Sequence, residues 1–337
     1  MHTIDSAATA RLLVEQIHQA EERIRGYVHR TPLVRSKTLS EQLGGEVYLK
    51  LECLQKTGSF KPRGAFNKLL SLTAEERERG VVGVSGGNHA QGLAYAASEL
   101  GVQASICMPS STPQNYLEAT REYGAQIVLC KDIHDAFARA EQLAREGLVT
   151  VHPFDDPWIA AGQGTIALEI LQDLPEVSRV YISIGGGGLI AGMATALRHA
   201  RPDIQIIGVE TRGADVMSQS VTAGKLIEMP AITSIARTLG APKASPFTLT
   251  HVQSLVDELV VVEDDETVDA MQFILERTKY LVEPAAACCL AAARRHMGQL
   301  CADDRIAILL CGGNVALSDL AQWYLEKRSR DAVEKRA

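Results

Sequence analysis

Short apolar runs rich in valine and isoleucine alternate along the chain with longer stretches whose apolar residues recur every three or four positions. This alternation predicts parallel β-strands joined by helices that cover both faces of a sheet. Amphipathic patterns of ten or more residues fill most of the gaps between the strands. The predicted strands are 47–52, 81–85, 104–108, 126–130, 150–154, 179–185, 205–210, 258–264 and 305–312.

The number of predicted strands bears on the domain organisation. Nine strands are too many for one small doubly wound sheet, which leaves two sheets or one barrel. The irregular stretch 220–253 interrupts the regular repeat that a barrel needs. The sequence therefore predicts two α/β domains, for which 337 residues are sufficient. Residues 1–30 show an amphipathic helix pattern, and residues 326–337 resemble a frayed helix end.

Composition and charge exclude several function classes. The net charge of −7, from 34 basic and 41 acidic side chains, disfavours nucleic acid or an anionic membrane as the main partner. No apolar run approaches the roughly 20 residues of a membrane helix, and the N-terminal stretch lacks a signal peptide pattern. The seven cysteines are scattered and odd in number, which indicates free thiols in a reducing compartment. We expect a cytoplasmic protein.

The residues around Lys61 are unusual for a lysine. Lys61 lies in the stretch TGSFKPRGAFNKLL, residues 57–70, between an aromatic residue and a proline. Most lysines are solvated surface residues. A lysine held in an apolar pocket has a lowered pKa, however, and can form a Schiff base with a carbonyl compound. The small neighbours Ser59 and Gly64 permit close approach of a ligand.

A run of four glycines, 185–188, ends a predicted strand and opens a predicted helix. Backbone N–H groups in such a turn converge on an anion at the positive end of the helix dipole. A tight turn needs only one glycine, so we favour a phosphate site. The P-loop pattern is absent. Glu210 is the only acidic residue at a suitable strand end, which leaves a dinucleotide-binding turn as a weaker interpretation.

Two further strand–glycine–helix junctions carry polar or reactive side chains. Residues 84–100 place Asn88 and His89 at the start of a helix, where Asn88 is a helix cap or a ligand contact. His89 alone is more often structural than catalytic. Residues 307–317 place Cys311 at a strand end, where it is inert core or a ligand neighbour. A phosphate site together with a nucleophilic lysine points to pyridoxal phosphate, an aldehyde that carries a phosphate.

These motifs resemble those of the fold-type II pyridoxal-phosphate enzymes, most closely the threonine/serine dehydratase and serine racemase group. The motifs KTGSFKPRGAFNKL, SGGNHAQGLAYAA, GGGGLIAG, VEPAAA and CGGNV follow the family's order across residues 56–315. The resemblance implies a tryptophan-synthase-β-like architecture with the cofactor in a cleft between two domains. Its large domain would comprise 1–54 and 156–337, and the region 55–155 would contain the inserted small domain.

The resemblance also implies roles for single residues. Lys61 would hold the cofactor as a Schiff base beside Phe60 and act as the α-proton base. Asn88 would bind the phenolic oxygen of the ring, and Cys311 would face the pyridine nitrogen. The phosphate would be bound by Gly185, Gly186, Gly187 and Gly188. The substrate carboxylate would be received by Ser85, Gly86, Gly87, Asn88 and His89.

The implied reaction is loss of water and ammonia from a β-hydroxy amino acid of the threonine or serine type, which yields a 2-oxo acid. A neutral thiol near the pyridine nitrogen makes the ring a weaker electron sink than an aspartate would, and this favours prompt loss of the β-hydroxyl group. The chain leaves no room after about residue 330 for a C-terminal regulatory domain, so the resemblance implies a catabolic enzyme.

The chain departs from the group's pattern at several positions. Gly86 stands where serine racemases carry a second serine, so we expect little racemisation. Glu210 and the Ala214 carbonyl match a divalent-cation site, but Val216 cannot act as a ligand. Tyr116 stands where threonine dehydratases have a lysine, which leaves a phenylserine, a hydroxyaspartate or the substrate of a hydroxyectoine-pathway dehydratase open.

Three alternative functions stay open on the sequence. The first is a pyridoxal-phosphate-dependent amino-acid racemase. The second is a nicotinamide-dependent oxidoreductase that uses the glycines 185–188 as a dinucleotide-binding turn. The third is a binding protein for an amino acid or phosphate without catalysis. By analogy with the family we expect a homo-oligomer, either a dimer or a tetramer.

Overall fold

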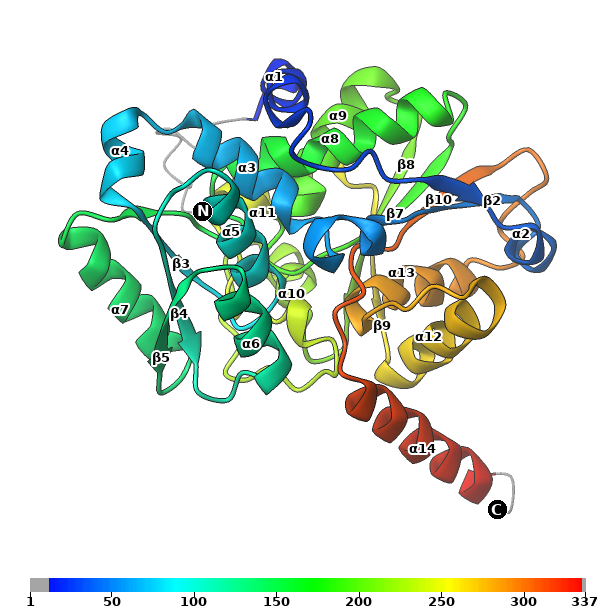
Figure 1. Cartoon of the computed structure of the whole chain (residues 1–337). Helices are drawn as coiled ribbons and strands as arrows, with labels where there is room; N and C mark the ends of the chain where they lie inside the picture. Colours follow the sequence, from blue (N-terminus) through cyan, green and yellow to red (C-terminus); the bar gives the residue numbers. More distant parts are fainter. Residues whose placement is uncertain (1–11, 335–337) are drawn as a thin grey trace.

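The strands of the computed structural model, which describes residues 12–334, form two separate sheets (Figure 1). The larger sheet has the order β1-β2-β10-β7-β8-β9, and its strands are parallel except for β1, which pairs with β2 in antiparallel fashion. Its strands are β1 (Leu33–Arg35), β2 (Glu46–Lys50), β7 (Arg179–Ser183), β8 (Gln205–Thr211), β9 (Glu258–Val262) and β10 (Arg305–Leu309).

Helices cover both faces of the larger sheet because its central strands are apolar on both sides, as β7 illustrates with four consecutive buried residues. Helices α9 and α13 pack on opposite faces, with α8 against α9 and α12 against α13 (Figure 1). The helices in the part of the chain that contains this sheet are α1 (Val14–Ile24), α2 (Lys37–Leu43), α8 (Pro157–Asp173), α9 (Gly188–Ala200), α10 (Val216–Ala223), α11 (Pro246–Leu255), α12 (Asp264–Thr278), α13 (Pro284–Arg295) and α14 (Leu317–Glu334).

The smaller sheet is entirely parallel and has the order β5-β4-β3-β6. Its strands are β3 (Val81–Val84), β4 (Ala104–Pro109), β5 (Gln126–Cys130) and β6 (Val149–Thr150). Its helices are α3 (Lys61–Ser71), α4 (Ala74–Arg79), α5 (Asn88–Glu99), α6 (Gln114–Glu122) and α7 (Ile133–Arg145). Three short 3₁₀ segments, η1 (Glu52–Leu54), η2 (Lys56–Gly58) and η3 (Arg237–Leu239), complete the structure of the described residues.

Helix α3 connects the two parts, because it packs on α5 of the smaller sheet and on α8 of the larger one. The contact with α8 depends on Gly162, where a Cβ atom would lie only 2.5 Å from the carbonyl oxygen of Arg63. Two glycines also bring α8 and α9 together: a Cβ on Gly192 would lie 2.7 Å from the backbone nitrogen of Gly164. This close helix packing fixes the start of α3, which is Lys61.

A buried ionic cluster holds the same end of α3. The guanidinium of Arg63 donates to Glu52 at 2.8 Å and to Glu169 at 2.7 Å, and the amine of Lys50 donates to Glu169 at 2.5 Å. These four side chains are buried and their charges balance. Removal of one partner from such a cluster leaves an uncompensated buried charge, which typically costs about 3–5 kcal/mol. The cluster therefore helps to fix the position of Lys61, two residues before Arg63.

The structure confirms the predicted α/β fold with parallel sheets. Every strand of the smaller sheet lies within 55–155 and every strand of the larger sheet lies outside it, while the domain boundaries themselves stay a prediction. One strand prediction was wrong in its bounds, and one strand was missed. The strand predicted at 150–154 ends at Thr150, because Pro153 has no N–H group to donate. The antiparallel strand β1 was not predicted at all.

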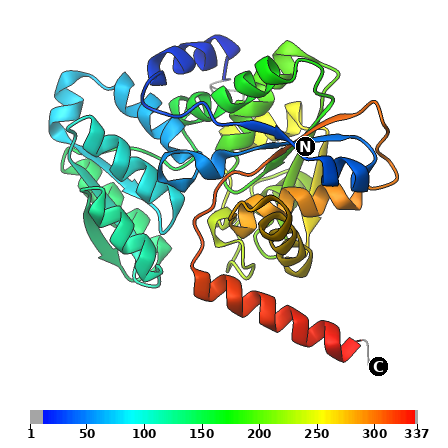
Figure 2. The same ribbon diagram turned by 45° about the vertical axis from the view of Figure 1, so that its right-hand side comes forward.

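The ends of the chain differ in how far they match the sequence patterns. Helix α1 occupies 14–24 of the N-terminal helical pattern, and residues 1–11 lie outside the described part. The predicted frayed end is helical as far as Glu334, and α14 projects from the body of the molecule in Figure 2. Within residues 12–334, no helix is both long enough and apolar enough to cross a membrane. All seven cysteines are free.

Candidate active site

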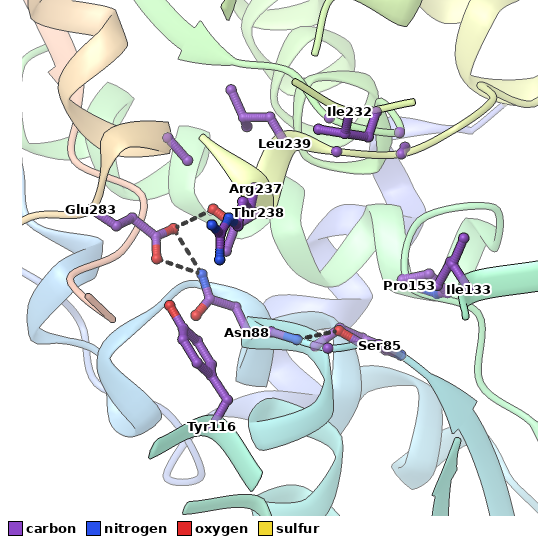
Figure 3. Close-up of a pocket in the computed structure, with 18 of the residues that line it drawn as sticks. Ser85, Asn88, Tyr116, Ile133, Pro153, Ile232, Arg237, Thr238, Leu239 and Glu283 are labelled. Carbon is purple, nitrogen blue, oxygen red and sulfur yellow. Dashed lines mark hydrogen bonds between the residues drawn. The ribbon is translucent and has the colours of Figure 1, made fainter. Parts of the chain in front are cut away.

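A cleft of about 680 Å³ lies where strands β3, β7 and β10 end, so both sheets contribute to it (Figure 3). Ligand sites of parallel α/β sheets lie at these carboxyl ends. The cleft brings together all residues that the sequence predicted for the cofactor and for the substrate carboxylate. They are Phe60, Lys61, Ser85, Gly86, Gly87, Asn88, His89, Gly185, Gly186, Gly187, Gly188 and Cys311.

Lys61 presents a partly buried amine to this cleft. Its Nζ atom donates a hydrogen bond to the carbonyl oxygen of Pro153 at 3.0 Å and lies 5.1 Å from the centroid of the Phe60 ring. Burial lowers the pKa of the Lys61 amine to about 8, although Cys311 and Glu283 act in the opposite direction. A much larger share of the amine is therefore neutral near pH 8 than in a solvated lysine, as a nucleophile requires.

The segment before Lys61 is anchored on the end of β10. The backbone N–H of Phe60 donates to the carbonyl oxygen of Cys311 at 3.1 Å, and the N–H of Gly313 donates to the carbonyl oxygen of Gly58 at 2.8 Å. These bonds explain why residues more than 250 positions apart in the chain line the same cleft. Burial raises the pKa of the Cys311 thiol well above its ordinary value, so the group is neutral.

The glycine run forms the turn between β7 and α9. Gly187 is the N-cap residue of α9 with a φ of 95°, a left-handed conformation that favours glycine. A Cβ atom there would lie 2.7 Å from the side chains of Met217 and Thr248. The N–H groups of Gly186 and Gly187 make no hydrogen bond with another described residue. The turn therefore offers donors at a helix N-terminus, where an anion binds favourably.

The second glycine-containing turn, between β3 and α5, has a firm internal structure. The N–H of Gly87 donates to the Ser85 hydroxyl at 3.0 Å. The Nε2 atom of His89 lies 3.0 Å from the carbonyl oxygen of Val151, and burial, with a smaller effect of Lys61, lowers the His89 pKa to about 3. His89 is thus a neutral, hydrogen-bonded histidine that fixes the turn.

Glu283 is a site residue that the sequence analysis missed. Its carboxylate is buried and accepts hydrogen bonds from the Asn88 amide at 2.8 and 3.1 Å and from the Thr238 hydroxyl at 3.1 Å (Figure 3). Burial raises the pKa of Glu283 to about 7. The motif VEPAAA held the signal, since an acidic residue inside an otherwise apolar stretch needs a partner. The other end of the Asn88 amide accepts from Asn314 at 2.8 Å.

Segment η3 was also missed, and it lies against both glycine turns. A Cβ on Gly87 would be 3.3 Å from the Thr238 methyl group, and a Cβ on Gly185 would be 3.1 Å from the Leu239 carbonyl oxygen. The same segment places Arg237 in the lining of the cleft. No sequence pattern indicates this arrangement, because the irregular stretch 220–253 shows no periodicity.

The position of Gly86 bears on the racemase alternative. A Cβ atom at Gly86 would lie 2.7 Å from the hydroxyl oxygen of Thr112. Thr112 therefore occupies part of the space that a serine side chain at position 86 would need. Because Gly86 itself carries no side chain, it offers no acid or base on this wall of the cleft.

The predicted metal residues lie outside the cleft. Both carboxylate oxygens of Glu210 accept backbone hydrogen bonds at the start of α10, from Met217 at 2.9 Å and Ser218 at 2.7 Å. Burial raises the pKa of Glu210 to about 7. Among residues 12–334, no group of three or more histidine, cysteine, aspartate or glutamate side chains could hold a metal ion. The divalent cation at Glu210 and Ala214 stays a prediction that this geometry does not favour.

The residues of the cleft fit pyridoxal phosphate. The amine of Lys61 suits an aldehyde, the open N–H groups of the glycine turn suit a phosphate, and the neutral Cys311 suits the edge of an uncharged ring. One buried hydroxyl in the lining, that of Thr112, has no hydrogen-bond partner among the described residues. Burying a hydroxyl group without a hydrogen bond typically costs about 1–3 kcal/mol of stability. A polar ligand that bonds to the hydroxyl offsets this cost.

Comparison with known proteins agrees with the site. The pyridoxal-phosphate dependent enzyme family matches residues 24–312. An L-threonine ammonia-lyase of Geobacter sulfurreducens is 44% identical over 308 residues, which cover 90% of this chain and 76% of that protein. A catabolic L-threonine dehydratase of Escherichia coli K12 is 38% identical, covering 92% of this chain and 95% of that protein.

Solved structures show the same relationship. Maize serine racemase superposes with a TM-score of 0.88 at 37% identity, over 95% of this chain and 99% of that one. The match to the pyridoxal-phosphate family favours this cofactor over the nicotinamide alternative for the glycine turn. The family match covers far more than half of the sequence and includes every residue that lines the cleft up to Cys311. The chain therefore belongs to the family of pyridoxal-phosphate-dependent enzymes.

Proposed function

We propose that the protein is an ammonia-lyase that converts a β-hydroxy amino acid of the threonine or serine type into a 2-oxo acid and ammonia. The observation that carries this proposal is the position of Lys61, whose amine of lowered pKa shares one cleft with the glycine turn at 185–188. The names of the relatives, L-threonine ammonia-lyase and catabolic L-threonine dehydratase, support the reaction class.

Bound pyridoxal phosphate supplies an aldehyde that takes up the substrate amine and a conjugated ring that accepts the electron pair of the Cα–H bond. In our proposal Lys61 holds the cofactor before the substrate arrives. The turn at 185–188 holds the phosphate, because its N–H groups at the N-terminus of α9 have no partner among the described residues. Phe60 borders the ring, since its side chain is buried beside Lys61 in the cleft lining.

Lys61 then acts as the base. Once it is displaced, its Nζ atom takes the proton from Cα of the substrate, and the lowered pKa increases the neutral share of the amine for this step. The β-hydroxyl group leaves with a proton as water. The released enamine becomes an imine, and water converts it to the oxo acid and ammonia. Cys311 stays neutral throughout, and this favours prompt departure of the hydroxyl group.

The turn at 85–89 orients the substrate. The N–H groups of Asn88 and His89 at the start of α5 have no partner among the described residues, and they suit the α-carboxylate of an amino acid. His89 contributes by fixing the turn through Val151. Asn88 is engaged by Glu283 and Asn314, so it is held rigidly at the position where we propose contact with the cofactor ring.

Amino-acid racemisation is the second candidate function, and the likeness to maize serine racemase favours it. Inversion at Cα needs a proton donor on the face opposite the lysine. Gly86 lacks a side chain, and Thr112 occupies part of the adjacent space. We therefore infer that elimination is much faster than racemisation.

A panel of substrates tests the proposal. The holoenzyme is incubated with L-threonine, L-serine, phenylserine and 3-hydroxyaspartate, and both 2-oxo acid and ammonia are quantified. The proposal predicts equal amounts of the two products from at least one member. Chiral analysis of the remaining serine must show little inversion. Rapid inversion without oxo acid, or no reaction with any member, would contradict it.

The setting of the enzyme in the cell also belongs to this proposal. The substrate is a small amino acid, and we infer no role for nucleic acid or membrane from the acidic net charge. A cytoplasmic homo-oligomer, either a dimer or a tetramer, stays a prediction. Size-exclusion chromatography with light scattering would determine the oligomeric state.

A further inference from the structure

Arg237 is a cation in the cleft without a partner in the protein. Apart from Lys61, it is the only arginine or lysine that lines the cleft within the described residues. Its guanidinium makes no hydrogen bond or ion pair with another residue in the described range 12–334. An arginine in such a place is available for a planar anion such as a carboxylate, which it can bind through two parallel hydrogen bonds.

The position of Arg237 is set by its neighbours in η3. Thr238 is tied to Glu283 by a hydrogen bond of 3.1 Å and contacts the turn that contains Gly87. Leu239 contacts Gly185 of the other turn. Figure 3 shows Arg237 and Thr238 beside Glu283 and Asn88, on one side of the cleft. The arginine therefore borders the space between the two turns, where the substrate would lie.

The other two anions expected in the cleft already have donors. The cofactor phosphate has the N–H groups of the glycine turn at 185–188, and the α-carboxylate has the first turn of α5. Arg237 is thus left for an anion on the substrate side chain. Tyr116, which also lines the cleft, offers no charge, because burial raises the pKa of its hydroxyl above the usual range.

We propose that Arg237 binds a second carboxylate, on the side chain of the substrate, so that the enzyme prefers a β-hydroxy dicarboxylic amino acid to threonine. The inference rests on the proposed function and assigns its substrate class. With 3-hydroxyaspartate, loss of water and its return during imine hydrolysis give oxaloacetate and ammonia, so the reaction balances without a further reactant.

The test compares Arg237→Gln, Arg237→Lys and the control Lys243→Gln. Lys243 is an exposed cation close to η3 that does not line the cleft, so its removal lowers the positive charge equally without touching the site. For each holoenzyme, kcat/KM is measured with 3-hydroxyaspartate and with threonine. A charge-assisted hydrogen bond predicts that Arg237→Gln lowers the ratio of the two values by about 10- to 100-fold. Arg237→Lys should retain part of the preference for 3-hydroxyaspartate over threonine, and Lys243→Gln should retain all of it.

A binding measurement gives a second readout that does not depend on turnover. Calorimetry compares succinate with butyrate, a pair that differs by one carboxylate, on each holoenzyme. The wild type should bind succinate at least about tenfold more tightly than butyrate, and Arg237→Gln should remove the difference. The affinity for pyridoxal phosphate is measured in parallel and should not change.

Several outcomes would overturn the inference. An equal loss for both substrates in Arg237→Gln would mean that Arg237 binds the α-carboxylate. A weaker affinity for pyridoxal phosphate would assign it to the phosphate. A wild-type preference for threonine or phenylserine would also contradict it. These results leave the ammonia-lyase function intact, whereas failure to release oxo acid from any β-hydroxy amino acid would remove the proposed function itself.

Discussion

The side-chain amide of Asn88 donates hydrogen bonds to both carboxylate oxygens of Glu283, at 2.8 and 3.1 Å. The bonds join the start of α5, beside the smaller sheet, to the start of α13, beside the larger one. Burial of the Glu283 carboxylate raises its pKa to about 7 from an ordinary value of 4.5. The protonation of this group should therefore affect the stability of the protein.

The first prediction concerns Glu283→Gln in cofactor-free protein. A carboxyl group whose pKa is higher in the folded state contributes stability below about pH 4.5, and this contribution is lost as the pH rises through about 7. The wild type should therefore lose stability relative to Glu283→Gln between pH 5 and pH 8, by about 2–3 kcal/mol. Urea unfolding at several pH values measures the difference.

The exposed Glu99→Gln variant is the control for the loss of one acidic group. A constant difference in stability between wild type and Glu283→Gln across this pH range would show that Glu283 titrates as it does in water.

The second prediction concerns the rate at which cofactor-free protein takes up pyridoxal phosphate. Only the neutral amine of Lys61 attacks the aldehyde, and its pKa is lowered to about 8 from 10.5. The second-order rate should rise with pH and level off above a midpoint near 8, as followed by the visible absorption band in a stopped-flow instrument. A rate that still rises steeply above pH 9.5 would mean that Lys61 behaves as a solvated lysine.

The third prediction concerns the phosphate-binding turn. Gly187→Ala introduces a Cβ atom in a left-handed conformation, 2.7 Å from Met217 and Thr248. It should cost about 1–2 kcal/mol of stability or more, and it should weaken binding of pyridoxal phosphate at least about tenfold. Unfolding and equilibrium titration measure the two effects.

Gly224→Ala is a matched control for Gly187→Ala. Gly224 is also left-handed, with a φ of 64°, but a Cβ there meets nothing within 4 Å and the residue does not line the cleft. It should show the backbone penalty without loss of cofactor affinity. Equal cofactor affinities in the two variants would mean that the turn at Gly187 does not bind the phosphate.

The fourth prediction concerns racemisation. Gly86→Ser supplies a hydroxyl group, but its Cβ would lie 2.7 Å from the Thr112 hydroxyl. The double variant Gly86→Ser/Thr112→Ala provides the space, so it should racemise serine faster than Gly86→Ser alone. A positioned acid or base contributes about 10²-fold or more, which is the increase expected over the wild type. Chiral chromatography of serine measures it, with Thr112→Ala alone as the control.

The alternation of apolar and amphipathic stretches was sufficient to predict the two parallel sheets and the location of most strands. Strand β1 was not predicted because its three residues, two of them exposed, carry no pattern, and its place depends on pairing with β2. The strand predicted at 150–154 was cut short by Pro153. The carbonyl group of Pro153 is instead turned toward Lys61. Short edge strands and turns depend on tertiary contacts that the local sequence does not encode.

The local motifs located the residues now found in the cleft, because glycines and Lys61 stand out from their neighbours. They did not reveal Glu283 or Arg237. The environment of Glu283 is created by Asn88 and Thr238, which lie 195 and 45 residues away in the sequence. The place of Arg237 depends on contacts of η3 with two distant turns. Such contacts appear only when the two sheets are placed relative to each other.

The covalent attachment of the cofactor tests the central claim most directly. The holoenzyme is reduced with borohydride and digested, and mass spectrometry locates the pyridoxyl group; Lys61→Ala and the exposed-site control Lys131→Ala are treated in the same way. Our account predicts the label on the peptide that contains Lys61, its absence in Lys61→Ala together with loss of oxo-acid release, and its retention in Lys131→Ala. A label on another lysine, or oxo-acid release at the wild-type rate from Lys61→Ala, would contradict the account.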